Sequence, residues 1–125
     1  MKLNTIEEGI SSFSNGKPVI IVDDEDRENE GDLTIPAESI TPEIINFMAT
    51  NARGLICVAI DKQYLDNLKI PPMVNGITSN NHTAFTVSVD SSQGITTGIS
   101  SFDRAKTIKD LIDEKSTAES FVKPG

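Results

Sequence analysis

The chain has 125 residues, of which 37% are hydrophobic and 24% charged, with a formal net charge of −8. This composition is typical of one soluble domain; no apolar run approaches the ~18 residues of a membrane span, and the acidic balance argues against nucleic-acid binding. The single cysteine, Cys57, excludes an internal disulfide framework and favours a reducing, cytoplasmic setting.

Start signals and apolar spacing predict helices along the whole chain. Thr5 and Glu8 have the spacing of a capping box, and Thr41 is followed by a proline at the first helical position. The predicted helices are 5–16, 41–54, 61–68 and a last helix that is capped by Ser101 or Asp103 and carries Ile108, Leu111 and Ile112 as its apolar stripe.

Apolar runs between these helices predict strands. They are "VIIV" at 19–22, "LTIP" at 33–36, "LICVAI" at 55–60 and "TAFTVSVD" at 83–90. The continuous runs are typical of strands buried on both faces. Strands separated by helices indicate an α/β (mixed α+β) fold, with a mixed sheet flanked by helices. Residues 1–125 form one domain, which we expect to be truncated at its C-terminus because "PG" is a turn signal with no closing strand after it.

Negative charge is concentrated directly after the first predicted strand. Seven of the 19 acidic residues lie between Asp23 and Asp32, where Arg27 is the only base. Like charges this close repel one another unless a cation or hydrogen-bond donors neutralise them. The run is therefore either a solvated acidic loop or a cation site.

The spacing of the acidic run excludes a calcium loop of the EF-hand type. With Asp26 as the first ligand, the twelfth position is Ala37, where that motif requires a bidentate glutamate. Magnesium fits better, since it takes one or two carboxylates together with waters and substrate oxygens, and ligands of α/β proteins gather at the carboxyl ends of strands. The residues alone leave a magnesium site and a solvated turn both open.

Several blocks of the sequence resemble one family. "DDEDRENEGDL" at 23–33 is similar to the signature of 3,4-dihydroxy-2-butanone 4-phosphate synthases, and "PAESIT", "GLICVAI", "PPMV", "TAFTVSVD" and "GITTGISSFDRAKTI" follow in that family's order, so that the similarity runs from about Gly16 to Gly125. The resemblance implies a cytoplasmic, homodimeric lyase of riboflavin biosynthesis. Such an enzyme converts D-ribulose 5-phosphate to 3,4-dihydroxy-2-butanone 4-phosphate and formate with Mg²⁺, or with Mn²⁺ as an alternative metal.

The resemblance also implies roles within the acidic run. Glu28 would bind the metal and contact the substrate, and Arg27 and Asp32 would contact the sugar phosphate. We choose Glu30 for acid–base catalysis, because a second carboxylate beside the metal can move a proton. The roles of the remaining acids stay open, and some of them are expected only to shape the loop; they are Asp23, Asp24, Glu25 and Asp26.

Outside the acidic run, other residues have both a functional and a structural interpretation. Cys57 is either a small buried hydrophobe within its strand or a catalytic residue in proton transfer. The hydroxyls of Thr96 and Thr97 suit either a capped turn or a loop that contacts a sugar or phosphate, and Thr97 is our candidate for the substrate. Arg104 either binds the phosphate or pairs with Asp103.

The family's histidine blocks are not found in these 125 residues. The resemblance places the metal-binding histidine in a later "GHTEA" block, and His82 is expected to be an exposed loop residue. We therefore expect a fragment with little activity alone. A non-catalytic module that binds Mg²⁺ or a sugar phosphate through the same loop is the alternative, and an acidic protein-interaction domain would need no ion. Whether a GTP cyclohydrolase domain follows is left open.

Overall fold

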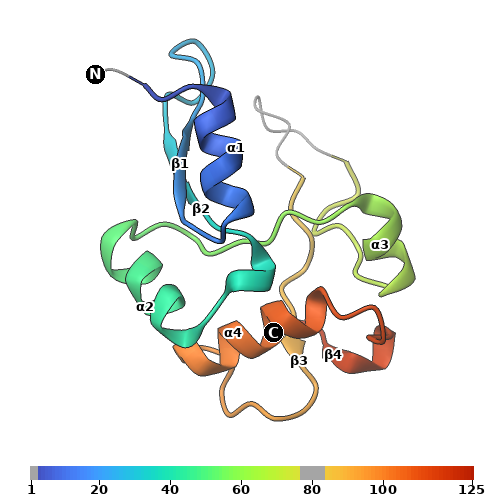
Figure 1. Cartoon of the computed structure of the whole chain (residues 1–125). Helices are drawn as coiled ribbons and strands as arrows, with labels where there is room; N and C mark the ends of the chain where they lie inside the picture. The colour runs from blue at the N-terminus through green and yellow to red at the C-terminus, as the bar shows by residue number, and fades with distance from the viewer. Residues whose placement is uncertain (1–2, 77–83) are drawn as a thin grey trace.

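The computed structural model describes residues 3–76 and 84–125, and helices and small sheets alternate along the chain (Figure 1). The helices are α1 (Ile6–Ser14), α2 (Pro42–Asn51), α3 (Lys62–Asn67) and α4 (Ser101–Leu111), with the 3-10 turns η1 (Ala37–Ser39) and η2 (Ala118–Ser120). The strands are β1 (Val19–Val22), β2 (Gly31–Thr34), β3 (Asp90–Ser91) and β4 (Phe121–Val122). This combination confirms the predicted mixed α+β class.

The helices begin where local signals place them. Thr5 and Glu8 form the predicted capping box of α1, with the Glu8 backbone N–H donating to Thr5 Oγ1 at 3.2 Å. The Thr41 hydroxyl accepts from the Ile44 N–H at the start of α2. Helix α4 is capped by Ser100, whose Oγ accepts from the Asp103 N–H at 3.0 Å, and not by Ser101 or Asp103. Side-chain caps satisfy N–H groups that have no partner within the helix, so they fix helix starts locally.

The strands differ more from prediction. They form two separate antiparallel pairs, β1 with β2 and β3 with β4, and Thr86 adds an isolated bridge to Pro72. Strand β1 is not buried on both faces as predicted, since Ile20 is 70% exposed and Ile21 is 55% exposed. A two-stranded ribbon beside a single helix, α1, has too few neighbours to cover both of its faces.

Residues 55–60 form an extended segment without a hydrogen-bonded neighbour in the described part of the chain, so the predicted buried strand is wrong there. Burial alternates along it: Ile56, Val58 and Ile60 pack inward, whereas Leu55 and Cys57 are exposed. The apolar run correctly marks an extended segment, but strand formation depends on a distant partner that local sequence does not reveal.

Helix α4 lies between two hydrophobic clusters and joins them. Ala105 and Ile108 pack with Ile40 and Ile45 in one cluster, and Leu111 packs in the other. The residues buried with Leu111 are Leu68, Ile70 and Phe121. Of the predicted stripe, Ile112 is the residue that stays partly exposed, because it follows the last helical turn.

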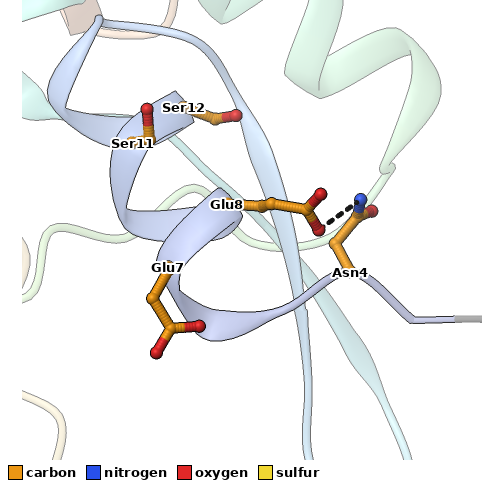
Figure 2. A pocket seen from close by; sticks show the side chains of 5 residues that line it. All are labelled: Asn4, Glu7, Glu8, Ser11 and Ser12. Atoms are coloured by element: carbon orange, nitrogen blue, oxygen red, sulfur yellow. Dashed lines mark hydrogen bonds between the residues drawn. The ribbon is translucent and has the colours of Figure 1, made fainter.

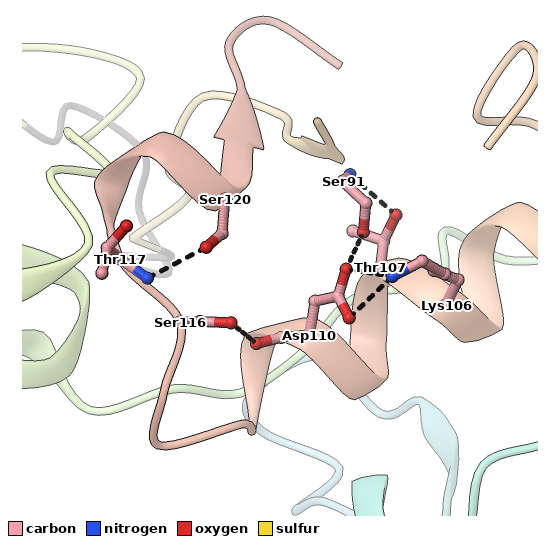
Figure 3. A network of polar contacts seen from close by, with 7 residues as sticks. All are labelled: Ser91, Lys106, Thr107, Asp110, Ser116, Thr117 and Ser120. Atoms are coloured by element: carbon pink, nitrogen blue, oxygen red, sulfur yellow. Dashed lines mark hydrogen bonds and ion pairs between the residues drawn. The ribbon is translucent and has the colours of Figure 1, made fainter. Parts of the chain in front are cut away.

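Polar contacts tie β3 to α4 (Figure 3). The buried Ser91 donates its N–H to Thr107 Oγ1 at 3.1 Å and its hydroxyl to Asp110 Oδ2 at 2.6 Å. Lys106 Nζ donates to the same carboxylate, so that its charge is compensated. No helix within residues 3–76 and 84–125 is long and apolar enough to cross a membrane.

Replacing Ile45 by Ala is expected to reduce the free energy of unfolding by about 2–5 kcal/mol, because this side chain is 1% exposed and its loss leaves a cavity. Urea unfolding followed by circular dichroism measures the change. Ile6→Ala is the control: Ile6 is 77% exposed, and its variant should stay within about 0.5 kcal/mol of the wild type. Equal losses in both variants would contradict this placement of the core.

Candidate functional site

The acidic run forms the loop of the β1–β2 hairpin. Val22 pairs with Gly31 at the end of the ladder, and residues 23–30 connect the two strands beyond it, at the top of Figure 1. The loop thus follows the carboxyl end of β1 as predicted, but in an antiparallel hairpin rather than at the edge of a mixed sheet. Asn29 adopts a positive φ of 52°, a conformation that asparagine tolerates better than most residues.

Asp23 organises this loop from within. Its carboxylate accepts the backbone N–H of Glu28 at 3.0 Å and that of Glu30 at 2.9 Å. It also pairs with Arg27 Nε at 3.1 Å. The two backbone hydrogen bonds, with the Arg27 charge in support, hold the pKa of Asp23 below its ordinary value. One aspartate therefore sets the backbone path of the turn on which Arg27, Glu28 and Glu30 lie.

The predicted residues of the loop differ in exposure and pairing. The Arg27 side chain is 57% exposed and also contacts Glu28, with 3.2 Å between Nη2 and Oε2. The Glu28 side chain is 27% exposed, and Glu30 is exposed at the end of the loop. A guanidinium, a partly buried carboxylate and an exposed carboxylate therefore share one turn.

Asp32 and Cys57 lie close enough to interact through their charges. Asp32 is exposed on β2, where it pairs with Ile21. Burial raises the pKa of the Cys57 thiol, and the negative charge of Asp32 raises it further. Cys57 is nevertheless exposed as a residue, which corrects its interpretation as a small buried hydrophobe. The structure therefore brings Cys57 from residues 55–60 towards the hairpin as a protonated thiol.

Thr97 and Arg104 do not join this group. They lie on the loop before α4 and on α4 itself, at the bottom of Figure 1, opposite the acidic loop. Thr97 is exposed, whereas the Thr96 hydroxyl donates to Asp103 at 2.8 Å. Among the described residues Arg104 pairs with no carboxylate, so the expected pair with Asp103 is not found. His82 lies outside the described residues.

The donor set of the hairpin suits a hard cation held in part by other oxygens. Within residues 3–76 and 84–125, no three histidine, cysteine, aspartate or glutamate side chains converge as a metal cluster. Magnesium needs no such closed set, because it commonly takes one or two carboxylates and completes its shell with water and substrate oxygens. Glu28 fits as one carboxylate ligand of this kind.

Two shallow depressions lie away from the predicted site. One is lined by Asn4 and side chains of α1, where Asn4 Nδ2 donates to Glu8 Oε2 at 3.2 Å (Figure 2). The other lies beside the Ser91–Asp110 network of Figure 3. Their side chains serve helix capping and packing, and neither depression contains a residue predicted for the site.

Two structural aspartates were missed from the sequence. The sequence leaves Asp23 among several acids without an assigned role, and it offers Asp103 only as a cap or as a partner of Arg104. Their positions in the sequence are the signal that could have identified them. Each aspartate precedes or follows a turn rich in Gly, Asn or Thr, where a carboxylate can accept hydrogen bonds from backbone N–H groups. Such signals identify a candidate, whereas the acceptor geometry comes from the structure.

Comparison with known proteins gives consistent results. The family model described as 3,4-dihydroxy-2-butanone 4-phosphate synthase matches residues 7–125. The synthase of that name from Agrobacterium fabrum is 54% identical over the whole chain, which covers 59% of that protein. The riboflavin biosynthesis protein RibBA of Phocaeicola vulgatus is also 54% identical over the whole chain, which covers 31% of that protein.

Solved structures agree. A crystal structure of 3,4-dihydroxy-2-butanone 4-phosphate synthase in complex with two magnesium ions has a TM-score of 0.94 and 40% identity, over 98% of this chain and 57% of that one. The synthase of Candida albicans has a TM-score of 0.85 and 40% identity, over 100% of this chain and 61% of that one. These likenesses place the chain in a class of biosynthetic enzymes. It belongs to the 3,4-dihydroxy-2-butanone 4-phosphate synthase family, and it spans less than two thirds of the length of each of these relatives.

Replacing Asp23 by Ala is expected to speed amide hydrogen exchange at Glu28 and Glu30 by about tenfold or more, because both N–H groups lose their acceptor. In the wild type, the ordering contributed by ionised Asp23 should be complete above its unfolded pKa of about 3.9 and be lost as the pH falls through its lowered folded pKa. Asp26→Ala, at an exposed position of the same loop, is the control. Equal exchange in both variants would show that Asp23 does not organise the turn.

Alkylation of Cys57 by iodoacetamide at pH 8 should be slower than that of an unstructured cysteine, because its raised pKa leaves less thiolate. Asp32→Asn removes the nearby negative charge and should speed the reaction roughly twofold to threefold. Asp24→Asn is the control and should have no effect. An alkylation rate that Asp32→Asn leaves unchanged would show that the Asp32 carboxylate does not affect the Cys57 thiol.

Proposed function

We propose that this chain supplies the acidic-loop part of an enzyme that converts D-ribulose 5-phosphate to 3,4-dihydroxy-2-butanone 4-phosphate and formate with Mg²⁺. The observation that carries the proposal is the hairpin loop in which Asp23 holds Arg27, Glu28 and Glu30 on one turn, in a chain that matches this family over residues 7–125. The neighbour solved with two magnesium ions supports the choice of metal. Mn²⁺ as an alternative metal stays a prediction from the resemblance, and a cytoplasmic location stays a prediction from the single cysteine.

Glu28 would hold the metal in this proposal. A bound divalent cation polarises a ketone and an adjacent hydroxyl, which acidifies the C–H bond between them. Glu28 is suited to this task because its carboxylate is a hard donor that lies on a turn fixed by Asp23. Its present contact with Arg27 is an ion pair near the surface, and such pairs contribute little and exchange readily.

The other hairpin residues would bind the substrate and move its protons. The exposed guanidinium of Arg27 matches the geometry of phosphate oxygens. Asp32 would accept a sugar hydroxyl, and Glu30, which is exposed, would take and return the proton. Cys57, kept protonated beside Asp32, would donate a hydrogen bond or a proton rather than act as a thiolate nucleophile.

Thr97 and Arg104 remain proposed contacts of the sugar phosphate. Within one chain, the loop before α4 and α4 itself, to which they belong, lie at the end opposite the acidic loop. We propose that the enzyme is a homodimer, as the resemblance implies, and that the loop before α4 of one copy meets the acidic loop of the other. A substrate would then touch both groups without any change of fold.

Calorimetry with the 125-residue chain tests the proposal. Mg²⁺ in the presence of ribulose 5-phosphate should bind measurably, and Glu28→Gln should weaken binding by at least about tenfold because it removes the charged ligand. Glu25→Gln, in the same loop, is the control. Formate release should stay below about 0.01 s⁻¹, against the ~10 s⁻¹ typical of enzymes, since the chain spans 57–61% of the solved synthases.

The possible outcomes separate the parts of this proposal. Binding that is indifferent to Glu28 would contradict the metal site. Formate release at an enzymatic rate would confirm the reaction and contradict the expected low activity. Absence of any ion or sugar-phosphate binding would favour an interaction domain instead.

A further inference from the structure

Asp103 is a buried carboxylate that faces the loop before its own helix. The residue is 5% exposed and lies in the first turn of α4. Its Oδ2 accepts the Thr96 N–H at 3.2 Å, the Thr96 hydroxyl at 2.8 Å and the Gly98 N–H at 3.0 Å. These hydrogen bonds hold the pKa of Asp103 below its ordinary value. Burying a carboxylate costs free energy unless hydrogen bonds compensate its charge. Here three donors of the loop compensate it, and all of them donate to the same oxygen, Oδ2.

Gly98 fixes the same loop from its other side. It is buried with a positive φ of 82°, a conformation that favours glycine. The carboxylate of Asp90 lies against its Cα, so that any side chain at this position would collide with it. The turn 96–98 is therefore held between two aspartates, one from β3 and one from α4.

This arrangement divides the two threonines into different roles. The Thr96 hydroxyl is consumed inward by Asp103. Thr97 is exposed, and within the described residues its hydroxyl has no partner. A fixed turn whose exposed hydroxyl is not used internally can bind a ligand oxygen without the entropic cost of ordering a mobile loop.

We propose that Asp103 is a positioning residue that fixes the turn 96–98, so that Thr97 presents its hydroxyl and backbone to an oxygen of the sugar phosphate. The inference rests on the proposed function for the identity of the ligand. Asp103 itself touches no substrate, because its carboxylate is buried behind the turn. Its contribution is the geometry of Thr97.

The test is a nuclear magnetic resonance titration of the 125-residue chain with ribulose 5-phosphate and Mg²⁺. In the wild type, the Thr97 amide should shift and saturate, while the Thr96 and Gly98 amides exchange slowly. Asp103→Asn keeps the shape but replaces a charged acceptor by a neutral one. It should speed exchange at Thr96 and Gly98 and raise the dissociation constant of the ligand by about tenfold, read equally at Thr97 and at residues 27–32 because one ligand contacts both groups.

Two further variants separate positioning from general stability. Thr97→Val should abolish the response at this loop and leave the slow exchange of Thr96 and Gly98 intact. Asp66→Asn, on α3, removes an exposed carboxylate that pairs with Lys62 instead, and should change neither readout. Faster exchange in Asp103→Asn with unaltered affinity at Thr97 would reduce Asp103 to a structural cap and overturn the inference.

The same titration distinguishes this inference from the proposed function. A response at residues 27–32 without one at Thr97 supports the hairpin site and overturns the positioning role. A response at Thr97 alone, weakened by Asp103→Asn, supports the positioning role and contradicts the hairpin as the substrate site. An absence of response at both ends overturns both.

Discussion

The packing of α4 is the constraint on which the rest of the structure depends. Its buried face contributes Ile108 to one hydrophobic cluster and Leu111 to the other, less than one turn apart. Val58, from the extended segment 55–60, packs against both clusters and also links them. Through β3, α4 also fixes the loop that precedes it, because Ser91 is hydrogen-bonded to both Thr107 and Asp110. Any change that shifts this helix moves both cores and the 94–98 loop together.

Each candidate functional loop is ordered by a single aspartate that accepts backbone N–H groups. Asp23 serves the hairpin loop, and Asp103 serves the turn at Thr96–Gly98. A carboxylate is an acceptor without donors, so it can gather several N–H groups whose directions a strand or helix would not allow. A loop whose side chains are polar and exposed cannot be ordered by apolar packing. In these two loops the hydrogen bonds to Asp23 and Asp103 supply the order instead.

The sequence was informative where structure is local and less so where it depends on distant partners. The caps at Thr5 and Thr41 place two helix starts correctly, because the capping hydrogen bonds join residues three apart. The run at 55–60 was correctly extended but lacks the neighbour that would make it a strand. Of the two interpretations of Cys57, the buried hydrophobe is the one that fails, because alternation in an unpaired segment leaves the residue exposed. The family resemblance identified the acidic run, whereas the role of Asp23 required its hydrogen bonds.

The charge anomaly of the acidic run is resolved only in part by the hairpin itself. Asp23 is compensated by two N–H groups and by Arg27, and Arg27 also contacts Glu28. In the proposed site, a metal at Glu28 would compete with the Arg27 guanidinium for the Glu28 carboxylate, and a phosphate would compete with Glu28 for the guanidinium. A cation at Glu28 in this proposed site would replace the Arg27 Nη2 contact, and the Nε contact with Asp23 would keep Arg27 in the loop. Arg27 would then have N–H donors available for an anion, such as the phosphate of the substrate. In the proposed site this loop carries its own counter-charge in Arg27, and a metal at Glu28 would release that charge to the substrate.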